Sequence, residues 1–486
     1  MEEKIIIALE IGSSKIKGAT GSVGPDGALN VKAVEEEPIT DIVRYGCIRN
    51  IVETAQAVRN VISRLEQREA PRKVEGVYLS LGGRSLSAQS VDIERRLASE
   101  TIITHDIIED ITREALDYAM NERSIVTVTP RELQVDGKAT RKPEGEMGSH
   151  ILARLNLISC RNQLLRNLSV VIEERLGLKI MDTFVRPLAL ADLVLLNDEK
   201  KLGCMLVDFG AETTTVAIYR GGVLVHLAVL PMGSRNITRD ITTLNYLEEQ
   251  AEELKRTGGS AFPTLEAAYS PVQPDFVAIN NYVSARACEI IINICEQIKY
   301  AGLIPSKLPE GIVIVGKGAR LKGFNQRLEQ LSGMKVRSGV PGNRLRILDG
   351  RIQVADSVDV LSILNKAAKS DPQECMSQRP VETPKPIIEQ PQAPVVTTTP
   401  STGGYTQPAA PEVPDNTQQA GTIGTRVPGQ PPKPTPTGIP STGENGNLKG
   451  ENGGKKSNPF VRGYNALVAK VANIITDTFE EEEDEE

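Results

Sequence analysis

Tryptophan is absent from this 486-residue chain, and aromatic residues make up only 3% of it. A hydrophobic core must therefore be built mainly from isoleucine, leucine and valine. Three histidines are too few for a typical metal cluster, and the six cysteines contain no CxxC pair. Such cysteines indicate buried thiols in a reducing compartment rather than a disulfide framework.

The chain also lacks a basic surplus and a long apolar run. Its 56 Lys and Arg are dispersed and face 63 Asp and Glu, a net charge of −7, which argues against a nucleic-acid partner. No run approaches the roughly 18 apolar residues that a spanning helix needs. The N-terminal apolar run is only about five residues long and follows acids, so we do not expect a signal peptide. At this length we expect several domains in a cytosolic protein, unless another feature brings it to a membrane.

The most informative stretch is a strand–turn–strand pattern between Met205 and Gly222. An apolar run leads to Asp208 and Gly210, three threonines follow at 213–215, and a second apolar run comes after them. Two short apolar runs around a polar, glycine-containing turn indicate a buried β-hairpin. Its amides and hydroxyls suit a phosphate, while the acid suits a magnesium ion that it reaches through water.

The stretch 5–18 repeats this pattern near the N-terminus. An apolar run leads to Glu10, then to Gly12, Ser13 and Ser14, and a second apolar stretch follows. Two such hairpins, one in each half of the chain, predict a duplicated α/β fold with a nucleotide between the two turns. The alternative is two unrelated core hairpins with polar turns.

Apolar periodicity predicts the main elements around these hairpins. Helices are expected at 48–69, 236–245 and 280–301. Strands are expected at 77–81 and at 312–315, where the second leads into the turn Gly316-Lys317-Gly318. Such a turn lets the backbone approach a base or ribose. Residues 84–165 read as a small α+β insertion, with a helix at 106–121 and strands at 124–128, 133–135 and 151–157.

The composition changes near residue 370. Residues 371–457 hold 16 of the 30 prolines and few large aliphatic residues, so this segment is expected to be a disordered linker. Residues 458–479 then follow a helical period, with the apolar side chains within an arc of about 140°. The residues expected to contact a membrane are Phe460, Tyr464, Leu467, Val468, Val471, Ile474, Ile475 and Phe479.

An amphipathic helix at the end of a long linker indicates an interfacial membrane anchor or a helix that binds a partner's groove. Docking back onto its own domain is a third possibility. Seven acids, 480–486, follow this helix. They oppose the helix dipole and are repelled by anionic headgroups, which keeps the protein-groove alternative open.

Together, these features resemble the FtsA family of bacterial cell-division proteins, in the actin/Hsp70/sugar-kinase superfamily. The motif matches run from about Ile5 to Lys369 and include Ala251–Lys255, similar to the family's ribose-contacting helix, and Val313–Phe324, similar to its adenosine motif. The resemblance implies an actin-like two-lobed fold with an inserted subdomain. The expected divisions are lobe 1 at 1–83, 166–200 and 350–370, the inserted subdomain at 84–165, lobe 2 at 201–235 and 305–349, its outer subdomain at 236–304, the linker at 371–457, the helix at 458–479 and the acidic tail at 480–486.

The resemblance also implies binding of ATP and Mg. The nucleotide-contacting residues would be Gly12, Ser13, Ser14, Lys15, Gly210, Thr213, Thr214, Glu252, Lys255, Gly316 and Gly318. The metal would be held through water by Glu10 and Asp208. The family usually has Asp at position 10, Gly-Gly at 211–212, and glycine at 317. Superfamily members commonly carry a glutamate near the hydrolytic water where this chain has Arg186. These departures favour an ATP-binding protein that is not an enzyme.

The resemblance further implies self-assembly into filaments at the cytoplasmic face of the inner membrane, at the division septum. There the protein would bind FtsZ and membrane lipids and recruit other divisome proteins. Two alternatives remain: a sugar- or acetate-kinase-type enzyme of the same superfamily, and a pilus-assembly actin homologue.

Overall fold

A first mixed sheet begins with the predicted N-terminal hairpin. The computed structural model describes residues 4–25, 27–140, 142–264, 274–342 and 345–378. The strand order of this sheet is β12-β7-β1-β2-β3-β18. The strands are β1 (Ile5–Ile11), β2 (Lys15–Val23), β3 (Leu29–Pro38), β7 (Gly76–Leu81), β12 (Lys179–Val185) and β18 (Leu345–Ile347). Strands β1, β2 and β3 are antiparallel, whereas β7 and β12 add to β1 in parallel.

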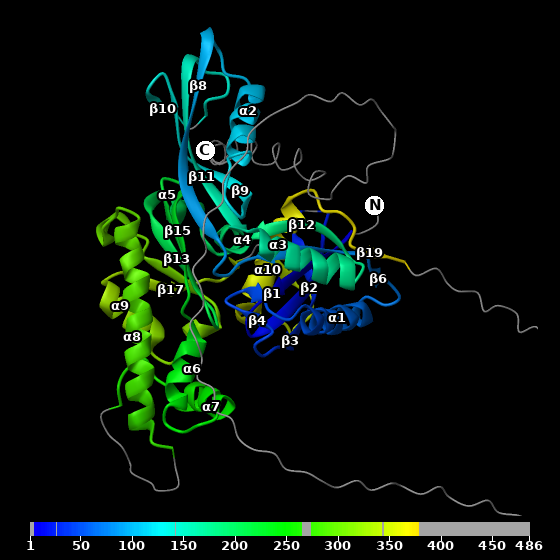
Figure 1. Cartoon of the computed structure of the whole chain (residues 1–486), viewed down its shortest axis with the longest axis vertical. Helices are drawn as coiled ribbons and strands as arrows, with labels where there is room; N and C mark the ends of the chain where they lie inside the picture. Colours follow the sequence, from blue (N-terminus) through cyan, green and yellow to red (C-terminus); the bar gives the residue numbers. More distant parts are fainter. Residues whose placement is uncertain (1–3, 26, 141, 265–273, 343–344, 379–486) are drawn as a thin grey trace, which may run out of the picture. The chain divides into compact units, whose positions relative to one another are not determined.

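A second sheet repeats this arrangement around the central hairpin. Its order is β15-β14-β13-β16-β17, from β13 (Cys204–Phe209), β14 (Thr214–Arg220), β15 (Val223–Leu230), β16 (Ile312–Val315) and β17 (Val336–Ser338). Three antiparallel strands are again extended by two parallel ones. Both hairpins and the duplicated fold are therefore confirmed. In Figure 1, β1, β2 and β3 of the first sheet are blue, and β13 and β15 of the second sheet are green.

Helices of the first half pack on the first sheet. Helix α1 (Ile51–Arg68) contacts β2 and β3, and its N-cap Asn50 side chain accepts a hydrogen bond from the Glu53 amide. Helix α10 (Val354–Lys369) contacts β1, β2, β7 and α4 (Arg186–Val194). Helix α3 (Asn162–Ser169) is continued by a π-helical turn at Val170–Arg175.

Helices of the second half surround the second sheet. They are α5 (Asn197–Leu202), α6 (Ser234–Thr242), α7 (Glu248–Gly258), α8 (Phe276–Tyr300) and α9 (Phe324–Ser332). Helices α8 and α9 lie side by side, and α8 packs on β14 and β15 (Figure 1). Short 3₁₀ turns stand at Pro305–Lys307 and Lys317–Arg320.

The inserted subdomain is a four-stranded antiparallel sheet with one helix. It contains β8 (Ser87–Ile102), β9 (Arg123–Val135), β10 (Lys138–Thr140), β11 (Met147–Arg161) and α2 (His105–Leu116). The two strands expected at 124–128 and 133–135 are one strand. Pro130 is tolerated inside it because it pairs with Leu155 at a β-bulge in β9, where Arg131 is the extra residue. The expected helix 106–121 ends earlier, at Leu116.

Strand β13 is buried on both faces, which explains its unbroken apolar sequence. Leu206 belongs to the hydrophobic cluster that also contains the first sheet, α1, α4 and α10. Its neighbours Met205, Val207 and Phe209 belong to a second cluster with α8 and α9. Alternate side chains of one strand thus serve two cores, so a shift of one residue in register would exchange them. A third cluster fills the inserted subdomain.

Two expected boundaries differ in the structure. Strand β18 was assigned to lobe 2 but pairs in parallel with β3 in the first sheet. The linker was expected from Asp371, yet β19 (Met376–Ser377) pairs with β6 (Lys73–Val74), and Cys375 is fully buried. The Cys375 amide also donates to Ile5 O at 2.9 Å. A composition rich in proline does not reveal these long-range contacts. They extend the folded body beyond Asp371, through β19.

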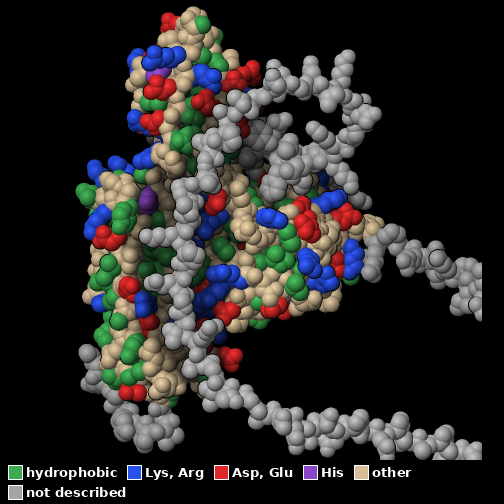
Figure 2. Space-filling model, in the orientation of Figure 1, with side chains coloured by type: hydrophobic (Ala, Val, Ile, Leu, Met, Phe, Trp, Pro, Cys, Tyr) green, Lys and Arg blue, Asp and Glu red, His purple; other side chains and the backbone are tan. Residues whose placement is uncertain are grey.

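The remaining described features are small. Strands β4 (Val43–Arg44) and β5 (Cys47–Ile48) form a short hairpin beside the first sheet's turn. No helix among the described residues is long and apolar enough to cross a membrane. Lys, Arg, Asp and Glu side chains are interspersed on the face drawn in Figure 2. The expected amphipathic helix, the acidic tail and the linker beyond residue 378 lie outside the described residues.

Residues 371–378 are expected to contribute to the stability of the first sheet. In the full chain, Met376→Ala removes a side chain that is 5% exposed and should lower the free energy of unfolding by about 2–5 kcal/mol. Urea unfolding followed by circular dichroism measures this change. The control is Gln373→Ala, because the Gln373 side chain is exposed. Equal unfolding curves for Met376→Ala and Gln373→Ala would contradict a stabilising role for residues 371–378.

Candidate functional site

The two hairpin turns converge on one short loop of the first half. The amides of Tyr45 and Gly46 are consecutive, and each donates to a different turn. Gly46 donates to the Ser13 hydroxyl at 3.0 Å, and Tyr45 donates to the Glu212 carboxylate at 2.5 Å. Turns that are about 200 residues apart in sequence therefore lie close together. This arrangement excludes the alternative of two unrelated hairpins on separate surfaces.

Arg186 lies between the acids of the two hairpins. Its guanidinium donates to Glu10 Oε1 at 2.8 Å and forms an ion pair with Asp208 Oδ2 at 2.9 Å. All three side chains are nearly buried, with exposed fractions of 13%, 4% and 9% for Arg186, Glu10 and Asp208. Arg186 follows directly on β12 and begins α4, so backbone geometry fixes its position. The predicted metal-binding acids are thus brought together, but around an arginine.

Burial changes the proton affinities of these acids. It raises the pKa of Glu10 from its ordinary value of 4.5 to about 7, and the charge of Asp359 adds to this, while Arg186 and Lys17 oppose it. Burial also raises the pKa of Asp208 against the opposing charge of Arg186. For Arg186, burial favours the neutral form, but Asp208 and Glu10 outweigh it and raise the pKa. The guanidinium therefore stays charged between the two acids.

A second buried ion pair lies beside this group. Lys17 on β2 contacts Asp359 of α10 at 2.5 Å and donates to Asp356 O at 2.6 Å. Burial lowers the pKa of Lys17, but Asp359 and Glu10 outweigh it, so that the net shift is upward. Neither residue was identified from the sequence. The available signal was a lysine inside an otherwise buried strand, where an unpaired charge is costly.

The carboxylate of Glu212, at a position where the resemblance leads us to expect glycine, lies within 4 Å of three arginine side chains. Its Oε1 atom lies 3.7 Å from Arg44, 3.2 Å from Arg235 and 3.4 Å from Arg239, and the side chain is 1% exposed. Arg44 belongs to the first half of the chain, whereas Arg235 and Arg239 belong to α6. The sequence predicts only a carboxylate that would repel a phosphate, because the arginines come from distant segments.

The expected ribose-contacting residues bind each other. Lys255 Nζ donates to Glu252 at 2.6 Å, to Thr238 Oγ1 at 2.9 Å and to Ser234 O at 3.2 Å. Lys255 is buried, and burial lowers its pKa although Glu252 opposes the shift. Thr238 Oγ1 also donates to Glu252 at 2.6 Å. This network fastens α7 to α6.

The glycine turn after β16 is required by packing. Gly316 has φ of +94°, and a Cβ there would lie 2.4 Å from Phe209 O at the end of β13. A Cβ on Gly318 would lie 2.7 Å from the Phe209 ring. Between them, Lys317 reaches Glu36 of β3 at 3.3 Å, and Glu36 also pairs with Lys15. The adenosine-like turn is thereby linked to the first hairpin.

The remaining predicted site residues lie in the turns as expected. Gly12 donates its amide to Lys15 O at 3.0 Å, and Gly210 donates to Thr213 O at 2.9 Å, so these two amides close the hairpins. The Thr214 hydroxyl donates to Met232 O at 2.8 Å. The Ser13 hydroxyl accepts from Gly46 and keeps its proton to donate, and Ser14 is exposed. The hydroxyls of the first turn are the groups that fit a phosphate.

The expected Mg²⁺ does not fit this arrangement. The carboxylates of Glu10 and Asp208, the expected metal-binding groups, contact the Arg186 guanidinium at 2.8 and 2.9 Å. A divalent cation that shared those oxygens would be repelled by this positive charge. In the described ranges, no three His, Cys, Asp or Glu side chains form a group that could hold a metal ion.

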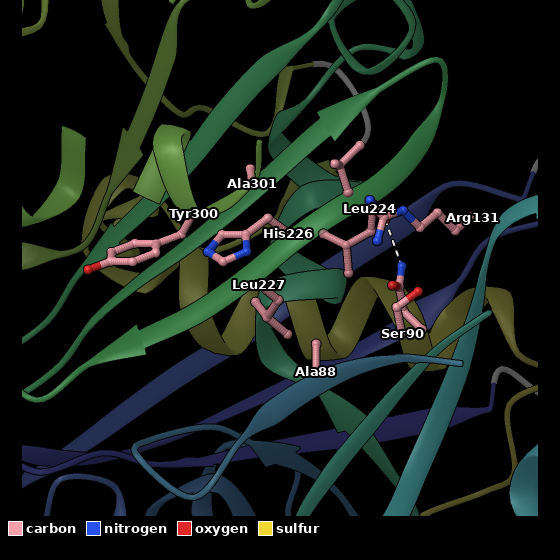
Figure 3. Close-up of a pocket in the computed structure, with 10 residues that line it drawn as sticks. Ala88, Ser90, Arg131, Leu224, His226, Leu227, Tyr300 and Ala301 are labelled. Carbon is pink, nitrogen blue, oxygen red and sulfur yellow. Dashed lines mark hydrogen bonds between the residues drawn. The ribbon is translucent and has the colours of Figure 1, made fainter. Parts of the chain in front are cut away.

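A separate pocket lies between the inserted subdomain and the second sheet (Figure 3). It has a volume of about 160 Å³ and is lined from β8, β9, β11, β15 and the end of α8. Asn156 Nδ2 donates to Leu224 O at 2.7 Å across it, and His226 and Tyr300 lie at its other end. None of the predicted site residues lines this pocket.

The duplicated sheet and the facing turns define an actin-like protein. A solved structure titled "PilM-PilN type IV pilus biogenesis complex" has the same fold, with a TM-score of 0.56 and 18% identity over 75% of this chain and 98% of that one. The profile of the family described as "Cell division protein FtsA" matches residues 205–358.

Curated relatives agree with this family match. FtsA of Porphyromonas gingivalis is 28% identical over 75% of this chain and 78% of its own length. FtsA of Escherichia coli K12 is 27% identical over 72% of this chain and 87% of its own length. By this profile and these relatives, the chain is similar to the FtsA family of cell division proteins.

The raised pKa of Glu10 predicts a pH-dependent stability. Between pH 4.5 and about 7 the folded chain holds a proton that the unfolded chain releases, so this group makes the unfolding free energy fall as pH rises. Glu10→Gln should remove this slope in urea titrations at several pH values. The control Glu132→Gln changes an acid whose pKa is lowered by hydrogen bonds from Gln134 and Arg154, and should leave the slope in place. An unchanged slope in Glu10→Gln would contradict the assignment.

Proposed function

We propose that this protein is a non-catalytic, actin-like adaptor that polymerises at the cytoplasmic face of the inner membrane, at the division septum. There it tethers FtsZ filaments to the membrane and helps to recruit later divisome proteins. The observation that carries the proposal is the similarity of the body to FtsA, found by the family profile and by the curated relatives.

The C-terminal sequence supports the tether. The 87 residues from 371 to 457 would span on the order of 50 Å as a flexible chain. Because residues 371–378 contact β6 and β1, the part proposed to act as a flexible linker would be slightly shorter. The apolar stripe of 458–479 follows it, and a helix of this kind binds where apolar and polar surroundings meet.

The buried charges support a role without catalysis. Arg186 occupies the position where the superfamily commonly carries a glutamate near the hydrolytic water, and both hairpin acids are ion-paired to it. No carboxylate in this group is free to orient an attacking water. We therefore propose that ATP, held between the two turns, acts as a structural ligand. The Ser13 hydroxyl would hold its phosphates, and the glycine turn at Gly316 would lie against the nucleoside.

Membrane binding should depend on the C-terminal helix. In vesicle flotation with anionic lipids, deletion of 460–486 should abolish association of the chain with the vesicles. A matched variant lacking only 480–486 should bind at least as well as the full chain, because it loses like-charge repulsion. If the larger deletion floats as the full chain does, the membrane anchor is wrong. If neither the full chain nor the variant lacking 480–486 floats with the vesicles, the helix is assigned to a protein groove.

FtsZ binding should be a property of the body. Purified FtsZ is expected to float with vesicles only when the full-length chain is present. The variant lacking 460–486 should still bind FtsZ in solution, as measured by co-sedimentation, but should not carry it to vesicles. Loss of both properties in that variant would place the FtsZ contact in the C-terminal region instead.

A further inference from the structure

The position of Arg186 is prepared by the fold. It stands where β12 ends beside β7, and Val185 pairs with Leu81, so that Gly82 lies next to the guanidinium. A Cβ at Gly82 would lie 3.3 Å from Arg186 Cζ and Nε, closer than most real contacts. The glycine therefore leaves space that the guanidinium fills. Arg186 is held in the cleft by packing as well as by charge.

The acids that Arg186 contacts come from both halves of the duplicated fold. Glu10 is the last residue but one of β1, and Asp208 is the last residue but one of β13, the equivalent strands of the two sheets. A metal ion bound through these residues would likewise join the two halves. The guanidinium makes the same connection with a single positive charge, at 2.8 and 2.9 Å. The neighbouring cation, Lys17, is engaged by Asp359 and does not compete for these oxygens.

One donor of this guanidinium is left over. Among the described residues, Arg186 Nε is buried without a hydrogen-bond partner, although both terminal nitrogens contact carboxylates. A buried donor of this kind costs free energy unless an acceptor reaches it. A phosphate oxygen is a suitable acceptor, because guanidinium groups bind phosphates through charge-assisted hydrogen bonds.

We propose that Arg186 replaces the divalent cation between the two hairpin carboxylates, so that this cleft neither binds Mg²⁺ nor needs it to hold a nucleotide. The part that concerns nucleotide rests on the proposed function, whereas the part that concerns the metal does not. Arg186 is thus a binding residue that pairs with both acids through a single positive charge and keeps one donor, Nε, without a partner among the described residues.

The test is Mn²⁺ binding by the full chain, because free Mn²⁺ is measured directly by electron paramagnetic resonance. Surface acids, including 480–486, bind Mn²⁺ weakly, so the wild type is compared with Asp208→Asn. Equal binding by these two proteins is expected. Arg186→Ala should gain one site, which Arg186→Ala combined with Asp208→Asn should lose. The matched control Arg286→Ala also removes an arginine from a carboxylate, Asp240, outside the cleft and should gain no such site.

Two outcomes would overturn the proposal. One is a Mn²⁺ site in the wild type that Asp208→Asn removes. The other is a folded Arg186→Ala variant that gains no site, which would make Arg186 a structural fastener only. If Arg186→Ala does not fold, the comparison of wild type with Asp208→Asn still decides the question.

A second measurement addresses the nucleotide. Calorimetry with ATP should give the same affinity in Mg²⁺ and in EDTA. Binding that occurs only with Mg²⁺ and is lost in Asp208→Asn would also overturn the proposal. Absence of ATP binding under both conditions would remove the nucleotide from the proposed function, while the Mn²⁺ comparison would still judge the role of Arg186.

Discussion

The structure depends on one positive charge shared by two buried carboxylates. Arg186 reaches Glu10 and Asp208, which lie near the ends of equivalent strands of two separate sheets. Removing one partner from a buried ion pair leaves an uncompensated charge, which is far more costly than the pair itself is stabilising. The three residues must therefore be retained or lost together. This constraint holds the two hairpin turns at a fixed separation.

A second group of charged side chains surrounds Glu212 in the turn of the central hairpin. Glu212 accepts from the Tyr45 amide and lies among Arg44, Arg235 and Arg239, while Gly46 donates to Ser13. Glu10, Arg186 and Glu212, which depart from the pattern expected from the resemblance, therefore each have charged partners. Lys317 pairs with Glu36, which also pairs with Lys15. The charged substitutions form three groups of ion pairs around the hairpin turns rather than unpaired charges.

The fold of this body and the charged side chains at its hairpin turns are two separate features. The duplicated sheets and the facing turns belong to an actin-like fold, and the sequence of this body is similar to FtsA. The charged side chains at the turns, Arg186 and Glu212 among them, add ion pairs to this fold. Glycines such as Gly316 and Gly318 are needed for packing against Phe209, whatever lies in the cleft. Retention of a family glycine is therefore weak support for ligand binding.

The sequence by itself determined both hairpins, the duplicated α/β fold and most helices, because burial patterns of period 2 and 3.6 are local properties of the chain. It also identified Glu10, Asp208 and the two glycine-containing hairpin turns as candidate site residues. Only the tertiary structure decided that β18 joins the first sheet, that β19 pairs with β6, and that Arg186 and Glu212 have their particular partners. These contacts join residues far apart in the sequence: 176 positions separate Arg186 from Glu10, and 316 separate Leu345 of β18 from its partner Leu29 of β3. No local pattern encodes which distant charge will neutralise another, since that depends on how the two sheets pack.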